Sequence, residues 1–142
     1  MPPELQSPEI QAFATGFPIT LLHAGMTLLI LVLGAGIYIL LTPHKEIRLI
    51  REGNVAAAVS LGGVLVGLAI PLAVSLNAST SIIDIGLWGA ATIVVQLLVF
   101  RLIDIMLHSL PKRIQDGEMA AAAFLVGAKL STALILAAAM AG

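Results

Sequence analysis

Lys129 is a lysine in the middle of an otherwise apolar segment, LVGAKLSTA, residues 125–133. At 1.5 Å per helical residue it is about 16 Å beyond Glu118, near the middle of a bilayer. A charged side chain there is costly and needs a partner or a water-filled cavity. Gln96, expected at a similar depth, can offer its carbonyl oxygen, and Thr132 lies within one turn of the lysine. These three residues form the predicted intramembrane polar site.

Two interpretations of this site remain open. In the first, a polar path for protons, a small ion or a polar solute runs past Gln96 and Lys129 from an outer mouth formed by Asp84 and His23. In the second, Lys129 fixes the register of the helices or pairs with an acid on an unseen membrane partner. We favour the second, assembly interpretation, because one lysine without an intramembrane acid is a poor basis for a path. Arg101 and Asp104, three residues apart near the cytoplasmic end, are expected to pair with each other.

Several function classes lack support in the sequence. The chain has no cysteine, and it contains no phosphate-binding loop, HExxH or GxSxG motif. His44 and His108 are too far apart in sequence to predict a metal pair. Neither an enzyme nor a metal or other cofactor is therefore expected.

Membrane-spanning helices must position these residues, because 59% of the 142 residues are hydrophobic and only 11% are charged. Soluble domains are far less apolar. A bilayer core of roughly 30 Å needs about 20 apolar residues per helix. Segments of this length run over about 18–41, 54–76, 83–107 and 118–141. The sequence thus predicts an all-α polytopic membrane protein with four transmembrane helices. Its first expected partner is the lipid bilayer that these helices cross.

The distribution of charge predicts the orientation. Every Lys and Arg outside the fourth span lies in or beside the first or third connection, namely Lys45, Arg48, Arg51, Arg101, Lys112 and Arg113. By the positive-inside rule both links are cytoplasmic. The N-terminus and the C-terminus then face the periplasm of a bacterial inner membrane. Basic clusters beside a membrane set topology or touch anionic lipid, and without interleaved aromatic residues they do not indicate nucleic-acid binding.

An internal repeat relates the two halves. REGNVAAAVSLGGVLVGLAIPLA, from Arg51, aligns with QDGEMAAAAFLVGAKLSTALILA, from Gln115, and Gly53 then meets Gly117. Each half is interpreted as a hairpin of two spans, and both hairpins begin on the same side of the membrane. The predicted fold is therefore a pair of parallel two-helix hairpin repeats.

The predicted organisation has three parts. Residues 1–17 form a periplasmic tail, in which Ser7 and Pro8 can begin a short interfacial helix. The first hairpin occupies residues 18–76 and the second occupies 83–142. The tail has no Lys or Arg, so it does not resemble a cleavable signal peptide, and the first span is expected to remain.

Small residues recur at the repeat spacing. Gly63 and Gly67 align with Gly127 and Ser131. Both pairs have the small-xxx-small spacing that lets membrane helices approach closely. We expect a helix-packing interface, formed either by these two helices of one chain or by their copies in a second subunit.

The two aligned segments, REGNVAAAVSLGGVLVGLAIPLA and GEMAAAAFLVGAKLSTALI, resemble the YjfL-like inner-membrane proteins, domain of unknown function 350. The resemblance covers nearly the whole chain after the tail. It implies four spans, a bacterial inner membrane and no assigned biochemical activity, with a link of some relatives to envelope stress or polyamines. It implies no role for Lys129.

The sequence therefore favours a non-enzymatic, homo-oligomerising assembly subunit of the bacterial envelope. The alternative is a small channel or transporter whose path passes Gln96 and Lys129.

Overall fold

The computed structural model describes residues 2–3, 7–42 and 45–142, and these form six α-helices. Two short helices, α2 (Glu46–Arg51) and α5 (Ser109–Gln115), lie in the links. Four helices are long and apolar enough to cross a membrane: α1 (Pro8–Leu41), α3 (Val55–Ala78), α4 (Ile82–Met106) and α6 (Met119–Ala141). The predicted all-helical fold with four spans is confirmed, and the last three spans lie close to their predicted boundaries.

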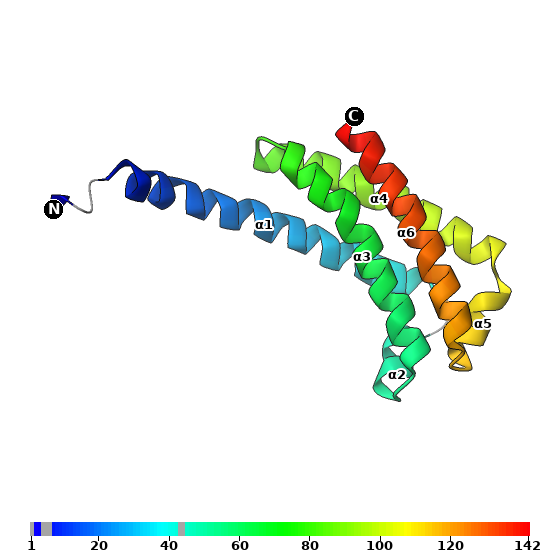
Figure 1. Cartoon of the computed structure of the whole chain (residues 1–142). Helices are drawn as coiled ribbons and strands as arrows, with labels where there is room; N and C mark the ends of the chain where they lie inside the picture. The colour runs from blue at the N-terminus through cyan, green and yellow to red at the C-terminus, as the bar shows by residue number, and fades with distance from the viewer. Residues whose placement is uncertain (1, 4–6, 43–44) are drawn as a thin grey trace.

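Helix α1 is longer than its predicted span. The Ser7 hydroxyl accepts a hydrogen bond from the Ile10 amide, and Pro8 occupies the first helical turn. No break follows at residue 18, so the residues expected to form a separate tail helix are the first turns of α1. At about 1.5 Å per residue its 34 residues extend about 51 Å. Residues 8–22 are exposed, and this half of α1 projects away from the other helices (Figure 1).

The two links end in the same way, as their places in the repeat predict. Gly53 and Gly117 have φ angles of 87° and 83°, a backbone conformation that residues with a side chain disfavour. The Gly53 amide donates to the Ile50 carbonyl at 3.0 Å, and the Gly117 amide donates to the Ile114 carbonyl at 2.9 Å. These C-terminal caps turn the chain from each link helix into the next span.

The main seam of the bundle joins α3 and α6, which pack along each other more extensively than any other pair of helices. A Cβ atom at Gly63 would lie 2.5 Å from Val126 of α6, so only glycine admits this approach. A second seam joins α1 and α4. There Ile93 of α4 fills the space beside Gly34, while Ile30 of α1 fills the space beside Gly89.

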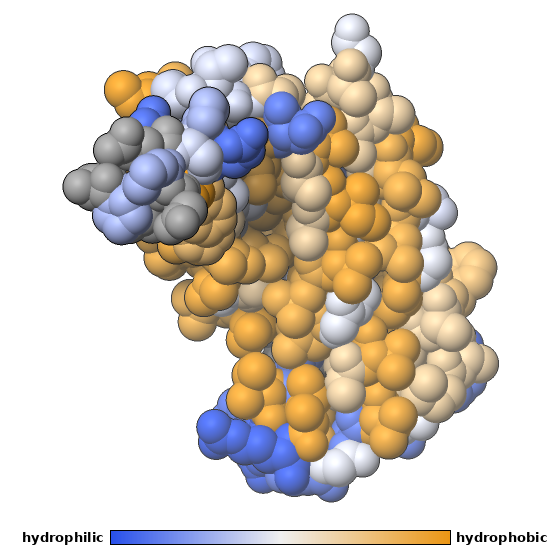
Figure 2. Space-filling view, turned by 60° about the vertical axis from the view of Figure 1, so that its left-hand side comes forward, coloured by the Kyte–Doolittle hydropathy of each residue, from blue (hydrophilic) through white to orange (hydrophobic). Residues whose placement is uncertain are grey.

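Between these seams lies a buried apolar core centred on Leu68, Leu72 and Phe100. A smaller cluster connects the beginnings of α3 and α6 with α5. On the face that Figure 2 shows, the surface is apolar along the spans, and hydrophilic residues gather toward the two ends of the molecule. The links lie at one end of the bundle, and the α3–α4 turn lies with the C-terminus at the other (Figure 1).

Candidate functional site

Three polar side chains from three helices are buried together. Tyr38 lies in the last turn of α1, Asp104 lies in the last turn of α4, and Lys129 lies near the middle of α6. Their exposed fractions are 1%, 7% and 1%. The long aliphatic stem of lysine lets its amine reach a level different from that of its backbone. Residues at different positions along three helices thereby meet in one centre.

The centre is a closed triangle of polar contacts. The Lys129 ammonium lies 2.8 Å from Oδ1 of Asp104. The Tyr38 hydroxyl donates to Oδ2 of the same carboxylate at 2.8 Å, and the ammonium donates to the Tyr38 hydroxyl oxygen. Each member therefore contacts the other two, and the buried charge of Lys129 is neutralised within the chain.

Aromatic rings complete the surroundings of the ammonium. Lys129 Nζ lies 4.5 Å from the ring centroid of Tyr38 and 5.4 Å from that of Phe100. The two rings meet edge to face, with their centroids 6.3 Å apart. Phe100 lies within the range at which an aromatic ring attracts a cation, whereas Tyr38 contacts the ammonium through its hydroxyl. Glu46 of α2, 1% exposed, adds a second acid close enough to interact electrostatically with Tyr38 and Lys129.

The partners of Lys129 differ from those expected. Its acid is Asp104, which the sequence suggested would pair with Arg101 on the same helix. Sequence reasoning also passed over Tyr38 and Glu46. One signal could have found Asp104: apart from Asp84 at its opposite end, it is the single acid in the predicted third span.

Gln96 is fully buried but bonds elsewhere. Its side-chain amide donates to the Gly67 carbonyl at 3.2 Å. Pro71 has no N–H, so the helix itself cannot supply the usual donor to this carbonyl, four residues earlier. Gln96 of α4 thus supplies the hydrogen bond that the Gly67 carbonyl of α3 lacks within its own helix. The Thr132 hydroxyl donates to the Lys129 carbonyl at 2.8 Å, which keeps it on its own helix.

The two residues of the predicted mouth do not lie in one pocket. Asp84 lies beside Ser75, Ser79 and Trp88 in a cavity between the ends of α3, α4 and α6. His23 lies on α1, where its carbonyl accepts a hydrogen bond from the Thr27 hydroxyl. Its side chain is not part of the lining of that cavity.

The small-residue pairs have different surroundings. Gly63 faces Val126 of α6, and a Cβ atom at Gly67 would lie 2.7 Å from the Phe100 ring. Gly127 has open space around it, and both Gly127 and Ser131 are exposed. The first pair is therefore filled within the chain, whereas the second faces outward.

The basic residues of the links are mostly exposed at one end of the bundle. Lys45, Arg48 and Arg51 line a cavity of about 460 Å³ that Glu46 also borders. Lys112 is exposed, and Arg101 is half-buried on α4. Arg113 forms an ion pair with Glu118 at the start of α6. Its hydrogen bond lowers the pKa of the Glu118 carboxyl below the usual value.

Among the residues that the structure describes, no group of three or more His, Cys, Asp or Glu side chains could hold a metal ion. His44 lies outside the described residues. The assembled centre can hold a charge in an apolar interior and can pass a proton among an amine, a carboxylate and a phenol.

Four apolar helices around an intramembrane ion pair define a polytopic integral membrane protein. Residues 12–140 match the family model of the Domain of Unknown Function DUF350, and the chain belongs to this family. It is similar to the UPF0719 inner membrane protein YjfL of Escherichia coli strain K12, with 36% identity over 104 residues, 73% of this chain and 79% of that protein. The YjfL protein of Escherichia coli O157:H7 matches to the same extent. No solved structure matches.

Proposed function

We propose that this protein is a non-enzymatic subunit of the bacterial inner membrane that assembles with further copies of itself and acts in the cell envelope. One observation carries the proposal. Gly127 and Ser131 of α6 form a small-residue face that is open to the surroundings, while their repeat counterparts on α3 are filled by Val126 and Phe100.

The open face has the composition of a membrane-helix interface. Ala123 precedes Gly127 and Ser131 at the same four-residue spacing, and all three are exposed. The Ser131 hydroxyl donates to the Gly127 carbonyl at 2.7 Å, so its polar group is satisfied without a partner. Small residues let two helix backbones approach closely. The van der Waals packing between the helices then favours their association in the membrane.

Helix α1 offers a second surface for assembly. Its buried residues are confined to its second half, at Gly34, Ala35 and Tyr38. The exposed first half carries Phe13 and Phe17, whose rings stack with centroids 4.9 Å apart. A neighbouring subunit would cover apolar surface that one chain leaves open.

The duplicated-hairpin arrangement belongs to the same proposal. Contacts between helices in corresponding places support it, because α3 packs along α6 and α1 packs along α4. The matching glycine caps of the two links support it as well. We place both links in the cytoplasm and both termini in the periplasm, in accordance with the basic residues of the links.

Native mass spectrometry of the purified protein tests self-assembly. The wild type should appear as an oligomer, and Gly127→Leu should shift it toward the monomer because a large side chain would hold the backbones apart. Gly36→Leu is the matched control, since Gly36 of α1 also has open space around it. A monomeric wild type, or equal dissociation by both variants, would contradict the proposal.

A second candidate function is conduction of protons or a small cation, and the buried Lys129–Asp104 pair favours it. Intramembrane charges commonly mark ion or proton pathways. In liposomes, Lys129→Leu should then abolish a proton flux that the wild type supports, while the oligomeric mass stays unchanged. A wild type that carries no flux, or a flux that survives in Lys129→Leu, would contradict conduction through this centre.

A further inference from the structure

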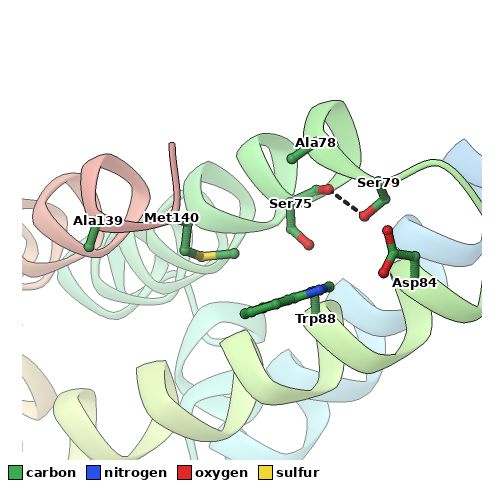
Figure 3. A pocket seen from close by; sticks show the side chains of 7 residues that line it. All are labelled: Ser75, Ala78, Ser79, Asp84, Trp88, Ala139 and Met140. Carbon is green, nitrogen blue, oxygen red and sulfur yellow. Dashed lines mark hydrogen bonds between the residues drawn. The ribbon is translucent and has the colours of Figure 1, made fainter. Parts of the chain in front are cut away.

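A cavity of about 400 Å³ lies at the end of the bundle opposite the links. It opens between the C-terminal end of α3, the first turns of α4 and the last turns of α6 (Figure 3). Its lining residues are Ser75, Ala78, Ser79, Asp84, Trp88, Ala139 and Met140. The cavity is separate from the Lys129 centre and shares no residue with it.

Ser75 brings a buried polar group to the wall of this cavity. The residue is 4% exposed, and its hydroxyl has no hydrogen-bond partner among the described residues. Serine in a helix usually bonds a carbonyl of the preceding turn. In this protein the hydroxyl instead points into the cavity, above the indole ring of Trp88 (Figure 3). The neighbouring Ser79 hydroxyl is already used, because it donates to the Ser75 carbonyl at 2.6 Å.

Charge gives the sign of the ligand. Asp84 is the charged residue of the lining, and no Lys, Arg or His belongs to it. One carboxylate oxygen accepts a long hydrogen bond of 3.4 Å from the Thr80 amide, which leaves acceptor capacity on the other. An anion would be repelled by this carboxylate, whereas a cation would be attracted.

The remaining lining selects the kind of cation. The indole ring of Trp88 presents a π surface that attracts organic ammonium groups. The side chains of Ala78, Ala139 and Met140 provide apolar contacts for a carbon chain. Ca²⁺ and Mg²⁺ prefer six or more oxygen ligands, whereas the lining offers one carboxylate and two hydroxyls.

We propose that this cavity binds the ammonium group of a small alkylamine or of an ethanolamine lipid headgroup. The ammonium charge lies against the Asp84 carboxylate and the Trp88 ring, and one of its N–H groups donates to the Ser75 hydroxyl. The attached carbon chain contacts Met140 and the alanines. The shared chemistry is an alkylammonium ion, whether it is dissolved in water or carried by a lipid.

Trp88 makes the proposal directly measurable, because it is the one tryptophan of the chain. The full-length protein is placed in phosphatidylcholine nanodiscs and titrated with n-butylammonium chloride. A saturable change in tryptophan emission is expected. The uncharged n-butanol and equal concentrations of sodium chloride should produce no saturable change, because they lack the organic cation.

Variants identify the groups that bind. Asp84→Asn should weaken the apparent affinity for n-butylammonium by about tenfold or more, because the ion pair is lost. Ser75→Ala should weaken it to a smaller extent. Asp116→Asn and Ser109→Ala are the matched controls, since both residues are exposed at the opposite end of the bundle, and they should bind as the wild type does. Circular dichroism checks that each variant retains its helices.

A second set of nanodiscs containing phosphatidylethanolamine distinguishes the two sources. An emission that is already shifted in these discs, and that Asp84→Asn returns to the phosphatidylcholine value, identifies the headgroup as the occupant. An unshifted emission that still responds to n-butylammonium identifies a soluble amine. No response to n-butylammonium in phosphatidylcholine, an equal response to n-butanol, or full binding by Asp84→Asn would overturn the proposal.

Discussion

At the scale of single residues, Lys129, Asp104 and Tyr38 join three helices through a buried ion pair and its hydrogen bonds. A buried ion pair adds little net stability over an apolar pair, because both charges lose their hydration. Breaking it is expensive, since the remaining charge then has no counterpart. The three residues come from α6, α4 and α1, so the centre fixes how these helices meet.

Replacing the acid tests this cost. Asp104→Asn should lower the free energy of unfolding by about 3–5 kcal/mol, because Lys129 would stay buried without its carboxylate. Thermal unfolding in detergent, followed by circular dichroism, measures the loss. The exposed Asp116→Asn, which changes the net charge equally, should shift the unfolding temperature little.

Removing both charges provides the complementary control. Asp104→Leu together with Lys129→Leu should recover much of the stability that either single change loses. Equal losses in Asp104→Asn and Asp116→Asn, or a double variant as unstable as the sum of the single ones, would count against a coupled ion pair.

The bond from Gln96 to the Gly67 carbonyl can be tested through the proline that makes it necessary. Gln96→Leu should cost about 1–3 kcal/mol in the free energy of unfolding, because a buried carbonyl loses its donor. Pro71→Ala restores a backbone N–H for that carbonyl. The effect of Gln96→Leu should therefore be smaller in the Pro71→Ala background, and an unchanged effect would show that the loss does not come from the Gly67 carbonyl.

At the scale of the helices, glycines decide which spans can approach. Gly63→Ala should lower the free energy of unfolding by about 1–3 kcal/mol, because the new methyl group overlaps the stiff side chain of Val126. Val126→Ala should relieve this loss in a double variant. Gly62→Ala, the adjacent residue with open space around it, is the matched control in thermal unfolding and should be neutral or slightly stabilising.

Asn54 makes hydrogen bonds at the ends of two helices. Asn54 caps α3 by accepting a hydrogen bond from the Ala57 amide at 2.9 Å. Its side-chain amide also donates to the carbonyls of Ile114 and Gln115, at 3.2 Å and 3.0 Å. One side chain therefore begins a span of the first half and closes the link helix of the second, which ties the halves together at the link end.

At the scale of the whole molecule, the orientation that we propose in the membrane rests on the position of the basic links. The chain has no cysteine, so single cysteines can be introduced without background. A cysteine at Thr80 or Gly142 should react with a membrane-impermeant maleimide added to spheroplasts, because both positions lie at the end that we place in the periplasm. A cysteine at Lys112 should react only after the membrane is permeabilised, and the reverse pattern would invert the topology.

Much of this architecture follows from composition and periodicity alone. The four spans are set by the length of apolar segments that a bilayer core requires, and the link ends are set by Gly53 and Gly117. The sequence does not predict that α1 begins as early as Pro8, because residues 8–17 are more polar than the apolar segment that follows them. Helix α1 begins at Pro8, where the Ser7 side chain caps its first turn.

The position of Lys129 within an apolar segment of spanning length is enough to predict that its charge needs a partner, because an isolated charge in the bilayer is costly. The identity of that partner, Asp104, and the bond of Gln96 to Gly67 become visible only when the helices are packed together. Such pairings depend on helix tilt, rotation and the reach of a flexible stem, which no spacing along a single helix contains. The outward position of Gly127 and the grouping of Ser75, Asp84 and Trp88 were decided in the same way, by the packing of three helices against one another.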